Sequence, residues 1–274
     1  MDSVSGALIQ KEITEEGILV LSLNDPGTGN ALSMAMSQAL AEALEQADSQ
    51  ANVHCLVLRS NGKHFCTGGN VKDMESGSDL MQGTVADIEA RLKSSLHRIT
   101  RAFEALRMPS IAAVNGDAVG AGCDISLMCD LRIASDEARF AESFLRLGLV
   151  SGIGGAWFLA RIVGRSKALE LTLTSEFIDA ATALDIGLVT RVVRRAELDA
   201  SVMQLARRIA ANPPNALRMA KRLVIEAAQS DLTSALEQAA AMQARLLSGQ
   251  EHKAVVSRFL ANEAARKRES RPAV

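Results

Sequence analysis

The chain has 274 residues, with 30 Lys and Arg against 32 Asp and Glu and a formal net charge of −2. This length can bury the core of one large domain or of a domain with an appendage. The near balance of charge lacks the basic footprint of a nucleic-acid-binding protein, so we expect a small organic ligand and no nucleic acid.

Residues 1–17 are partly acidic, and glycines and Arg161 interrupt the most apolar segment, residues 147–164. We therefore expect neither a signal peptide nor a membrane span. The cysteines form no CxxC pair and have no histidine at metal-binding spacing; they are Cys55, Cys66, Cys123 and Cys129. This pattern predicts reduced thiols, no metal site and a cytoplasmic location.

Short runs rich in β-branched residues alternate with helical patterns along most of the chain. The strand-like runs are residues 17–23, 53–60, 110–116, 131–135 and 187–193. Helical patterns cover residues 33–50 and 84–107, and this alternation predicts an α/β fold.

The strand pattern stops after about Arg195, and the rest of the chain has helical patterns rich in Ala, Leu, Arg and Gln. We therefore expect a core over residues 1–195 and a helical region over residues 196–274. Amphipathic helices at a terminus need a partner surface to bury one face, which points to oligomerisation.

Two glycine-bearing segments follow predicted strands. Gly68 and Gly69 lie in the loop after the strand at residues 53–60, where irregular backbone can turn its N–H groups towards a ligand. Further on, a helix is predicted to begin near Gly120, Ala121 and Gly122. Helix N-termini present unpaired N–H groups, and two such main-chain donors would form an oxyanion hole.

These segments, in this order, resemble the crotonase, or enoyl-CoA hydratase/isomerase, superfamily. The matching stretches are "GNALS" (29–33), "FCTGGNVKDM" (65–74), "PSIAAVNGDAVGAGCDISLMCDLRIAS" (109–135), "ARFAESFLRLGLVSGIGGAWFLARIVG" (138–164) and "ALDIGLVTRVV" (183–193). The resemblance implies a spiral of ββα units with a C-terminal helical region that builds trimers, often paired into hexamers. It also implies an acyl-CoA thioester as substrate, so that coenzyme A arrives with the substrate and no separate cofactor is needed.

Carried over by position, the oxyanion donors of the family fall on the N–H groups of Gly69 and Ala121, which Gly68 and Gly120 precede. The residues that hold the nucleotide end of CoA fall on Ala31, Leu32 and Lys72. An aromatic residue that packs over CoA from a neighbouring subunit falls on Phe259. The resemblance thus predicts which segments contact the substrate.

The two carboxylates that act as acid and base in the hydratases of the family are only partly present in this sequence. The first carboxylate of the hydratases falls on Asp124, which is shorter than the usual Glu and whose alternative role is to complement a helix dipole. The second falls on Phe144, which cannot move a proton and is expected to contact the substrate. Glu142 is the nearest carboxylate in the sequence and could substitute, although an exposed loop residue is the simpler interpretation.

His97 aligns with a histidine base of the aryl-CoA dehalogenases of this superfamily, but Gly152 stands where their nucleophilic Asp would be, so dehalogenation is not expected. The resemblance favours an enoyl-CoA hydratase that stabilises a thioester enolate. The alternatives are an enoyl-CoA double-bond isomerase, which needs only one carboxylate, and a catalytically weak acyl-CoA-binding homologue.

Overall fold

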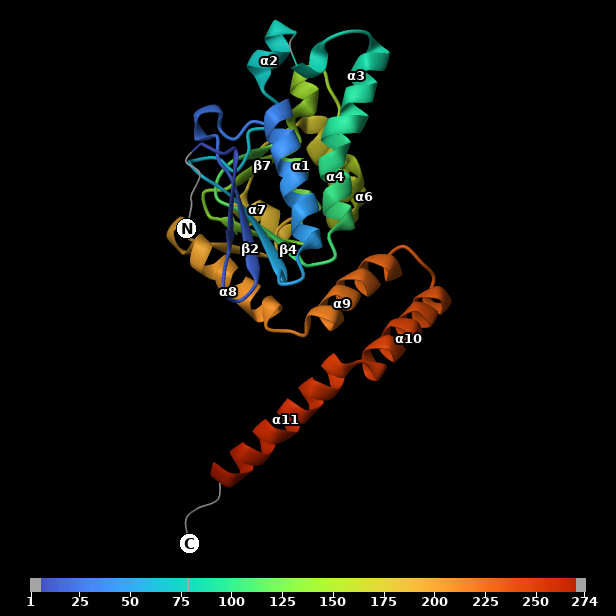
Figure 1. The fold of residues 1–274 in the computed structure, drawn as a ribbon. Helices are drawn as coiled ribbons and strands as arrows, with labels where there is room; N and C mark the ends of the chain where they lie inside the picture. Colours follow the sequence, from blue (N-terminus) through green and yellow to red (C-terminus); the bar gives the residue numbers. More distant parts are fainter. Residues whose placement is uncertain (1–5, 78, 270–274) are drawn as a thin grey trace. The chain divides into compact units, whose positions relative to one another are not determined.

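The computed structural model describes residues 6–77 and 79–269 of the chain (Figure 1). The strands are β1 (Ile9–Ile13), β2 (Ile18–Leu23), β3 (Cys55–Ser60), β4 (Ser110–Val114), β5 (Ala118–Val119), β6 (Leu131–Ser135), β7 (Arg139–Ala141), β8 (Ile178–Asp179) and β9 (Arg191–Val193). The α-helices are α1 (Met34–Ser49), α2 (Val71–Ser76), α3 (Val85–Arg91), α4 (His97–Ala105), α5 (Ala121–Met128), α6 (Gly155–Thr174), α7 (Ala180–Asp185), α8 (Leu198–Ala210), α9 (Pro214–Ala227), α10 (Leu232–Ser248) and α11 (Gln250–Glu269). The shorter helical turns are η1 (Pro26–Thr28), η2 (Asp79–Met81), η3 (Leu92–Leu96), η4 (Ser143–Leu147) and η5 (Arg195–Glu197).

A six-stranded sheet in the order β1-β2-β3-β4-β6-β9 forms the centre of the fold. Only β1 pairs antiparallel with its neighbour, and the other pairs are parallel. All residues of β2 and β4 are buried, as expected for strands covered on both faces. The five strand-like runs of the sequence correspond to β2, β3, β4, β6 and β9, so the α/β prediction is confirmed.

A second, three-stranded sheet in the order β5-β7-β8 lies next to the chain segments that form the cavity described below. Strand β5 pairs parallel with β7, and β7 pairs antiparallel with β8. These strands are only two or three residues long. Strand β5 carries the chain from β4 into α5, and β7 carries it from β6 into η4, so these two strands position both sides of the site.

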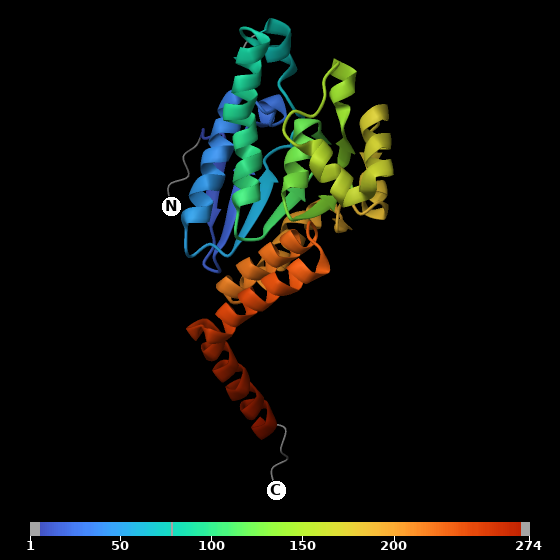
Figure 2. The ribbon, with the colours of Figure 1, turned by 90° about the vertical axis from the view of Figure 1, so that its right-hand side faces the viewer.

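Helices α1 and α4 lie side by side against the large sheet (Figures 1 and 2). Ser33 caps α1 by accepting a hydrogen bond from the Met36 N–H, and Leu40 and Leu44, one turn apart, are fully buried. The single helix predicted over residues 84–107 is present as α3 and α4 with the π-helical turn η3 between them. This turn shifts the helical phase, and Leu92 and Leu96 of η3 line the cavity.

The chain divides into two compact units, the first ending at Ile209 and the second beginning at Ala210. This boundary lies later than the expected one at residues 195 and 196, because η5 and α8 belong to the first unit. Leu198, Val202 and Ala206 of α8 are buried there.

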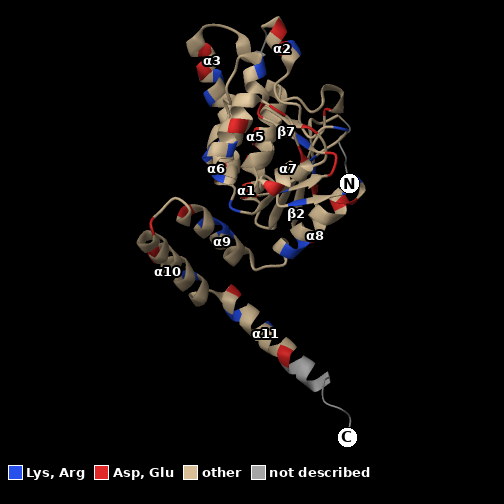
Figure 3. Cartoon of the chain, turned by 180° about the vertical axis from the view of Figure 1, so that it is seen from behind, with Lys and Arg blue, Asp and Glu red and all other residues tan. Residues whose placement is uncertain are grey.

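The second unit contains α9, α10 and α11, and acidic and basic residues are interspersed along its drawn helices (Figure 3). Among the described residues, no helix combines the length and the apolar character that crossing a bilayer requires.

Candidate active site

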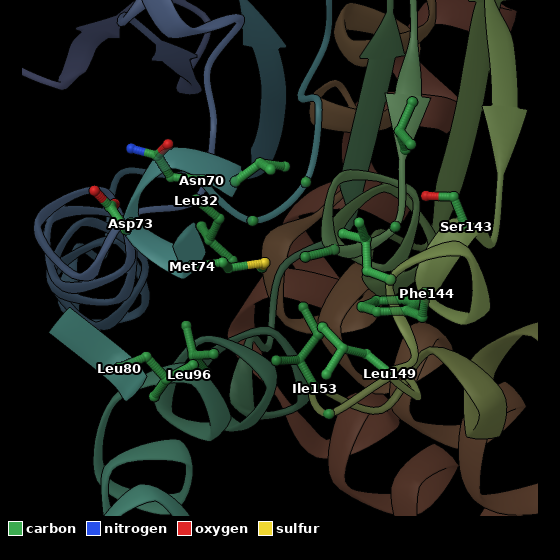
Figure 4. Close-up of a pocket in the computed structure, with 18 of the residues that line it drawn as sticks. Leu32, Asn70, Asp73, Met74, Leu80, Leu96, Ser143, Phe144, Leu149 and Ile153 are labelled. Carbon is green, nitrogen blue, oxygen red and sulfur yellow. The ribbon is translucent and has the colours of Figure 1, made fainter. Parts of the chain in front are cut away.

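A cavity of about 540 Å³ lies in the first unit, within the size range of small-molecule sites. Its apolar lining comprises Leu32, Met34, Val71, Met74, Leu80, Met81, Ile88, Leu92, Leu96, Val119, Ala121, Phe144, Leu147, Leu149, Val150, Ile153 and Phe177. Leu80 and Leu96 lie on one side of the space near Met74, and Phe144, Leu149 and Ile153 lie on the other (Figure 4). Such a lining suits a flexible hydrocarbon chain.

The main chain of Gly69 and Ala121 meets this cavity at one corner, which we call the oxyanion corner (Gly68, Gly69, Gly120 and Ala121). Ala121 is the first residue of α5, so its N–H has no partner within the helix. Within the described part of the chain, neither the Gly69 N–H nor the Ala121 N–H takes part in a hydrogen bond of a turn or loop. Both donors are therefore available to an oxygen atom of a ligand.

Close packing between two loops creates this corner. The Val119 N–H donates to the Cys66 carbonyl oxygen at 3.0 Å, which ties β5 to the loop after β3. Gly68 has φ of +91°, and a Cβ built on it would lie 2.7 Å from the Val119 carbonyl oxygen. Any other residue would be strained in this conformation and would force the two loops apart. Gly68 is thus required for the approach of Gly69 to Ala121.

Asp124, one turn after Ala121, is fully buried and does not belong to the cavity lining. Its Oδ2 accepts a hydrogen bond from the Ser151 hydroxyl at 2.7 Å, and the Ser151 oxygen accepts one from the Gly155 N–H at 2.9 Å. A Cβ built on Gly155 would lie 1.6 Å from Asp124 Oδ1. The carboxyl group is therefore packed against the first turn of α6.

Glu142 is also buried, at 4% exposure, contrary to the interpretation of this residue as an exposed loop Glu. Its carboxyl group is close enough to that of Asp124 for each to shift the pKa of the other. Burial raises the pKa of Asp124 well above its usual range, and the neighbouring charge of Glu142 raises it further. Burial also raises the pKa of Glu142, opposed by hydrogen bonds with Cys123 and Asp124. We call Asp124 and Glu142 the carboxyl pair.

The residues next to the carboxyl pair in the sequence form part of the cavity wall. Ser143 and Phe144 directly follow Glu142 and line the cavity, as do Gly152 and Ile153 after Ser151. Figure 4 shows Ser143 beside Phe144. A Cβ built on Gly120 would lie 3.6 Å from Ser143 Oγ and 3.7 Å from Phe144 Cζ, so both side chains flank the oxyanion corner. Ser143 was not identified from the sequence, because a hydroxyl in a short turn gives no local signal.

Of the other residues implied by the resemblance, only some lie at the cavity. Leu32 lines the cavity, whereas Ala31 is buried outside the lining and Lys72 is exposed on α2. Phe259 belongs to the second unit and is 62% exposed. His97 Nε2 lies 2.8 Å from the Gly152 carbonyl oxygen and is not part of the lining, so its observed contact is with the turn before α6.

Comparison with known proteins places the chain in a family. The model of the enoyl-CoA hydratase/isomerase family matches residues 13–267. The chain belongs to this family. A crystal structure of an enoyl-CoA hydratase from Mycobacterium smegmatis is similar, with a TM-score of 0.85 and 34% identity over 93% of this chain and 96% of that one. The predicted crotonase fold is therefore confirmed.

Two curated relatives have different acyl groups in their names. A short-chain-enoyl-CoA hydratase from Clostridium acetobutylicum is 34% identical over 82% of this chain and 84% of the relative. A 2,3-dehydroadipyl-CoA hydratase from Escherichia coli is 31% identical over 90% of this chain and 93% of the relative. Membership in the family therefore does not specify the acyl group.

Proposed function

We propose that this protein is an enoyl-CoA hydratase that adds water across the double bond of a trans-2-enoyl-CoA with an apolar acyl chain. The observation that carries the proposal is the presence of two main-chain donors, Gly69 and Ala121, on the wall of one apolar cavity. A thioester oxygen between them would be stabilised as negative charge develops on it.

The apolar side of the cavity favours an uncharged hydrocarbon chain. Leu80, Ile88, Leu92 and Leu96 provide aliphatic surface on α3, η3 and the preceding turn. In Figure 4 Asn70 and Asp73 turn their polar ends away from Met74 and the space beside it. Burial of each CH₂ group contributes about 0.8 kcal/mol, so a longer aliphatic chain gains affinity as it extends along this surface.

Hydration also requires that protons be moved. In the proposed reaction water adds its OH to the β-carbon and loses a proton to the carboxyl pair, while Asp124 of the pair gives a proton to the α-carbon. Because the pair lies behind the cavity wall, this transfer requires the Asp124 carboxyl group to turn from Ser151 towards the cavity. The pair thus ends with the number of protons with which it began. Ser143 supplies a hydroxyl beside Gly120 that can hold the attacking water, which Phe144 cannot do.

The direct test is an assay of the purified protein with trans-2-enoyl-CoA thioesters of increasing length. Hydration is followed by the loss of absorbance of the conjugated thioester. We expect turnover, with kcat/KM rising with chain length until the cavity is filled. Binding of acyl-CoA without turnover would instead support a catalytically weak homologue, and absence of binding would refute the proposal.

Phe144 favours a second candidate function, the migration of a double bond in a 3-enoyl-CoA. Its ring lies in the cavity wall at the position where the resemblance places the second acid of a hydratase. Isomerisation needs one proton-carrying group that takes a proton from one carbon and returns it to another. A protein that isomerises a 3-enoyl-CoA but does not hydrate the 2-enoyl product would establish this alternative.

The second unit supports a proposal about assembly. Leu232, Leu236, Leu247 and Phe259 of α10 and α11 are more than half exposed, and such apolar side chains need a partner surface. We expect homotrimers or homohexamers. Light scattering at micromolar concentration measures this directly, and a stable monomer would contradict the expectation.

A further inference from the structure

The carboxyl pair has fewer hydrogen-bond donors than its buried oxygen atoms need. Asp124 is completely buried and Glu142 is almost completely buried. Ser151 donates to Asp124 Oδ2, but Asp124 Oδ1 and Glu142 Oε1 have no donor among the described residues. A buried carboxylate oxygen without a donor is costly, and two neighbouring carboxylates would add the repulsion of like charges.

One proton held between the two groups resolves both problems. Because the Ser151 hydroxyl already donates to Oδ2, the vacant position on Asp124 is Oδ1. The O–H group of a protonated Asp124 then donates a hydrogen bond to the carboxylate of Glu142. Burial raises the pKa of Glu142, and the neighbouring Cys123 thiol opposes this shift.

We propose that Asp124 and Glu142 share a single proton at neutral pH and that Glu142 is the positioning residue that keeps Asp124 in its proton-donating form. The proposal deepens the proposed function and depends on it only for its catalytic consequence. Glu142 acts through Asp124, and it need not touch the substrate itself.

The other titratable groups around the pair do not supply this proton. Burial and the charge of Glu142 raise the pKa of Cys123, so this thiol stays protonated. Arg132 is buried nearby, but its guanidinium donates to the carbonyl oxygens of Cys129 and Leu188. From α4, His97 contacts the Gly152 carbonyl oxygen, and from α6 the Gly155 N–H reaches Ser151.

The shared proton makes stability depend on pH in a defined direction. The pKa of Asp124 is raised by folding, so the folded chain holds a proton that the unfolded chain releases at neutral pH. The stabilising contribution of such a group is complete below its unfolded pKa and is lost as pH rises through its folded pKa. Stability from this pair should therefore fall as pH rises.

The test compares urea denaturation midpoints of the full-length protein at about pH 5 and about pH 8, the interval in which the unfolded carboxyl groups are ionised. The variants are Glu142→Gln and Asp124→Asn, each with an amide that donates without needing the shared proton. We expect the midpoint of the wild type to fall across this interval and that of both variants to fall less. Glu137→Gln, the same substitution at an exposed position, should behave like the wild type.

A second measurement reports on Asp124 alone. In Glu142→Gln the neighbouring negative charge is gone, so the basic limb of the pH profile of kcat/KM, where Asp124 loses its proton, should move to lower pH. Glu137→Gln should leave the limb in place. A purely structural role for Glu142 would lower activity at all pH values without moving the limb.

The outcomes separate the two proposals. If both amide variants keep the pH dependence of the wild-type midpoint, no proton is shared and the inference is overturned, whatever the protein catalyses. If the midpoints behave as expected but no enoyl-CoA is turned over, the shared proton stands and the proposed function fails. If only one amide variant folds, the pH dependence of its midpoint alone decides.

Discussion

The oxyanion corner and the carboxyl pair each include one residue of α5, Ala121 and Asp124, but are built in opposite ways. The corner uses main-chain N–H groups, and the side chains of Gly68, Gly69, Gly120 and Ala121 matter mainly because they are small. The pair uses two carboxyl groups that meet only because β7 and α5 bring Glu142 to Asp124. Both features depend on tertiary contacts, but the corner needs only small residues where two loops meet, whereas the pair needs two particular carboxyl side chains in the interior.

The largest effect is expected from a substitution of Asp124, which breaks the carboxyl pair. Asp124→Asn keeps the shape of the side chain but cannot carry the proton, so hydration should fall about a hundred- to ten-thousand-fold in kcat. Steady-state kinetics measure kcat, and calorimetry should show nearly unchanged acyl-CoA affinity. Asp185→Asn, at an exposed position in α7, is the matched control. Undiminished turnover would show that Asp124 is not the acid.

A smaller effect is expected on stability, from the packing of α6 against the pair. In Gly155→Ala the new methyl group would meet Asp124 Oδ1, and overpacking of this kind costs about 1–3 kcal/mol in the free energy of unfolding. Denaturant titration measures the loss. Gly27→Ala serves as the control, because its nearest atom would be 3.9 Å away. Equal stability of the two variants would mean that Gly155 does not restrain Asp124.

The smallest effect is expected from a substitution of Ser143, which distinguishes hydration from isomerisation. Ser143→Ala removes the hydroxyl beside Gly120, and the loss of one hydrogen bond of about 1 kcal/mol should slow hydration by several-fold. Double-bond migration uses no water and should be unaffected. Parallel assays with a 2-enoyl-CoA and a 3-enoyl-CoA measure both rates, with Ser94→Ala on the exposed side of η3 as the control. Equal losses in both reactions would argue against a role in holding water.

The sequence predicted the main sheet because its strands are continuous apolar runs, and β2 and β4 are completely buried. It missed β1, whose residues after Ile9 are exposed, and β5, β7 and β8, which are too short to show a period. The two compact units divide after Ile209, and the sequence could not show on which side α8 packs, since an amphipathic helix has the same pattern whichever surface it packs on.

At the site, the two glycine-bearing segments gave the oxyanion corner because they need small residues at fixed places along the chain. The sequence could suggest Glu142 but could not show that it is buried against Asp124, because that contact joins separate elements. The roles of Gly69, Ala121, Asp124 and Glu142 remain predictions.

The most direct test of the central claim removes one main-chain donor. Proline is tolerated at the first position of a helix, so Ala121→Pro should keep α5 intact while it eliminates the Ala121 N–H. Ala121→Gly retains the N–H and is the matched control, and circular dichroism checks that both variants fold. We predict that kcat for hydration falls about a hundred- to a thousand-fold in Ala121→Pro and changes little in Ala121→Gly. A folded Ala121→Pro protein with turnover close to the wild type would contradict the account.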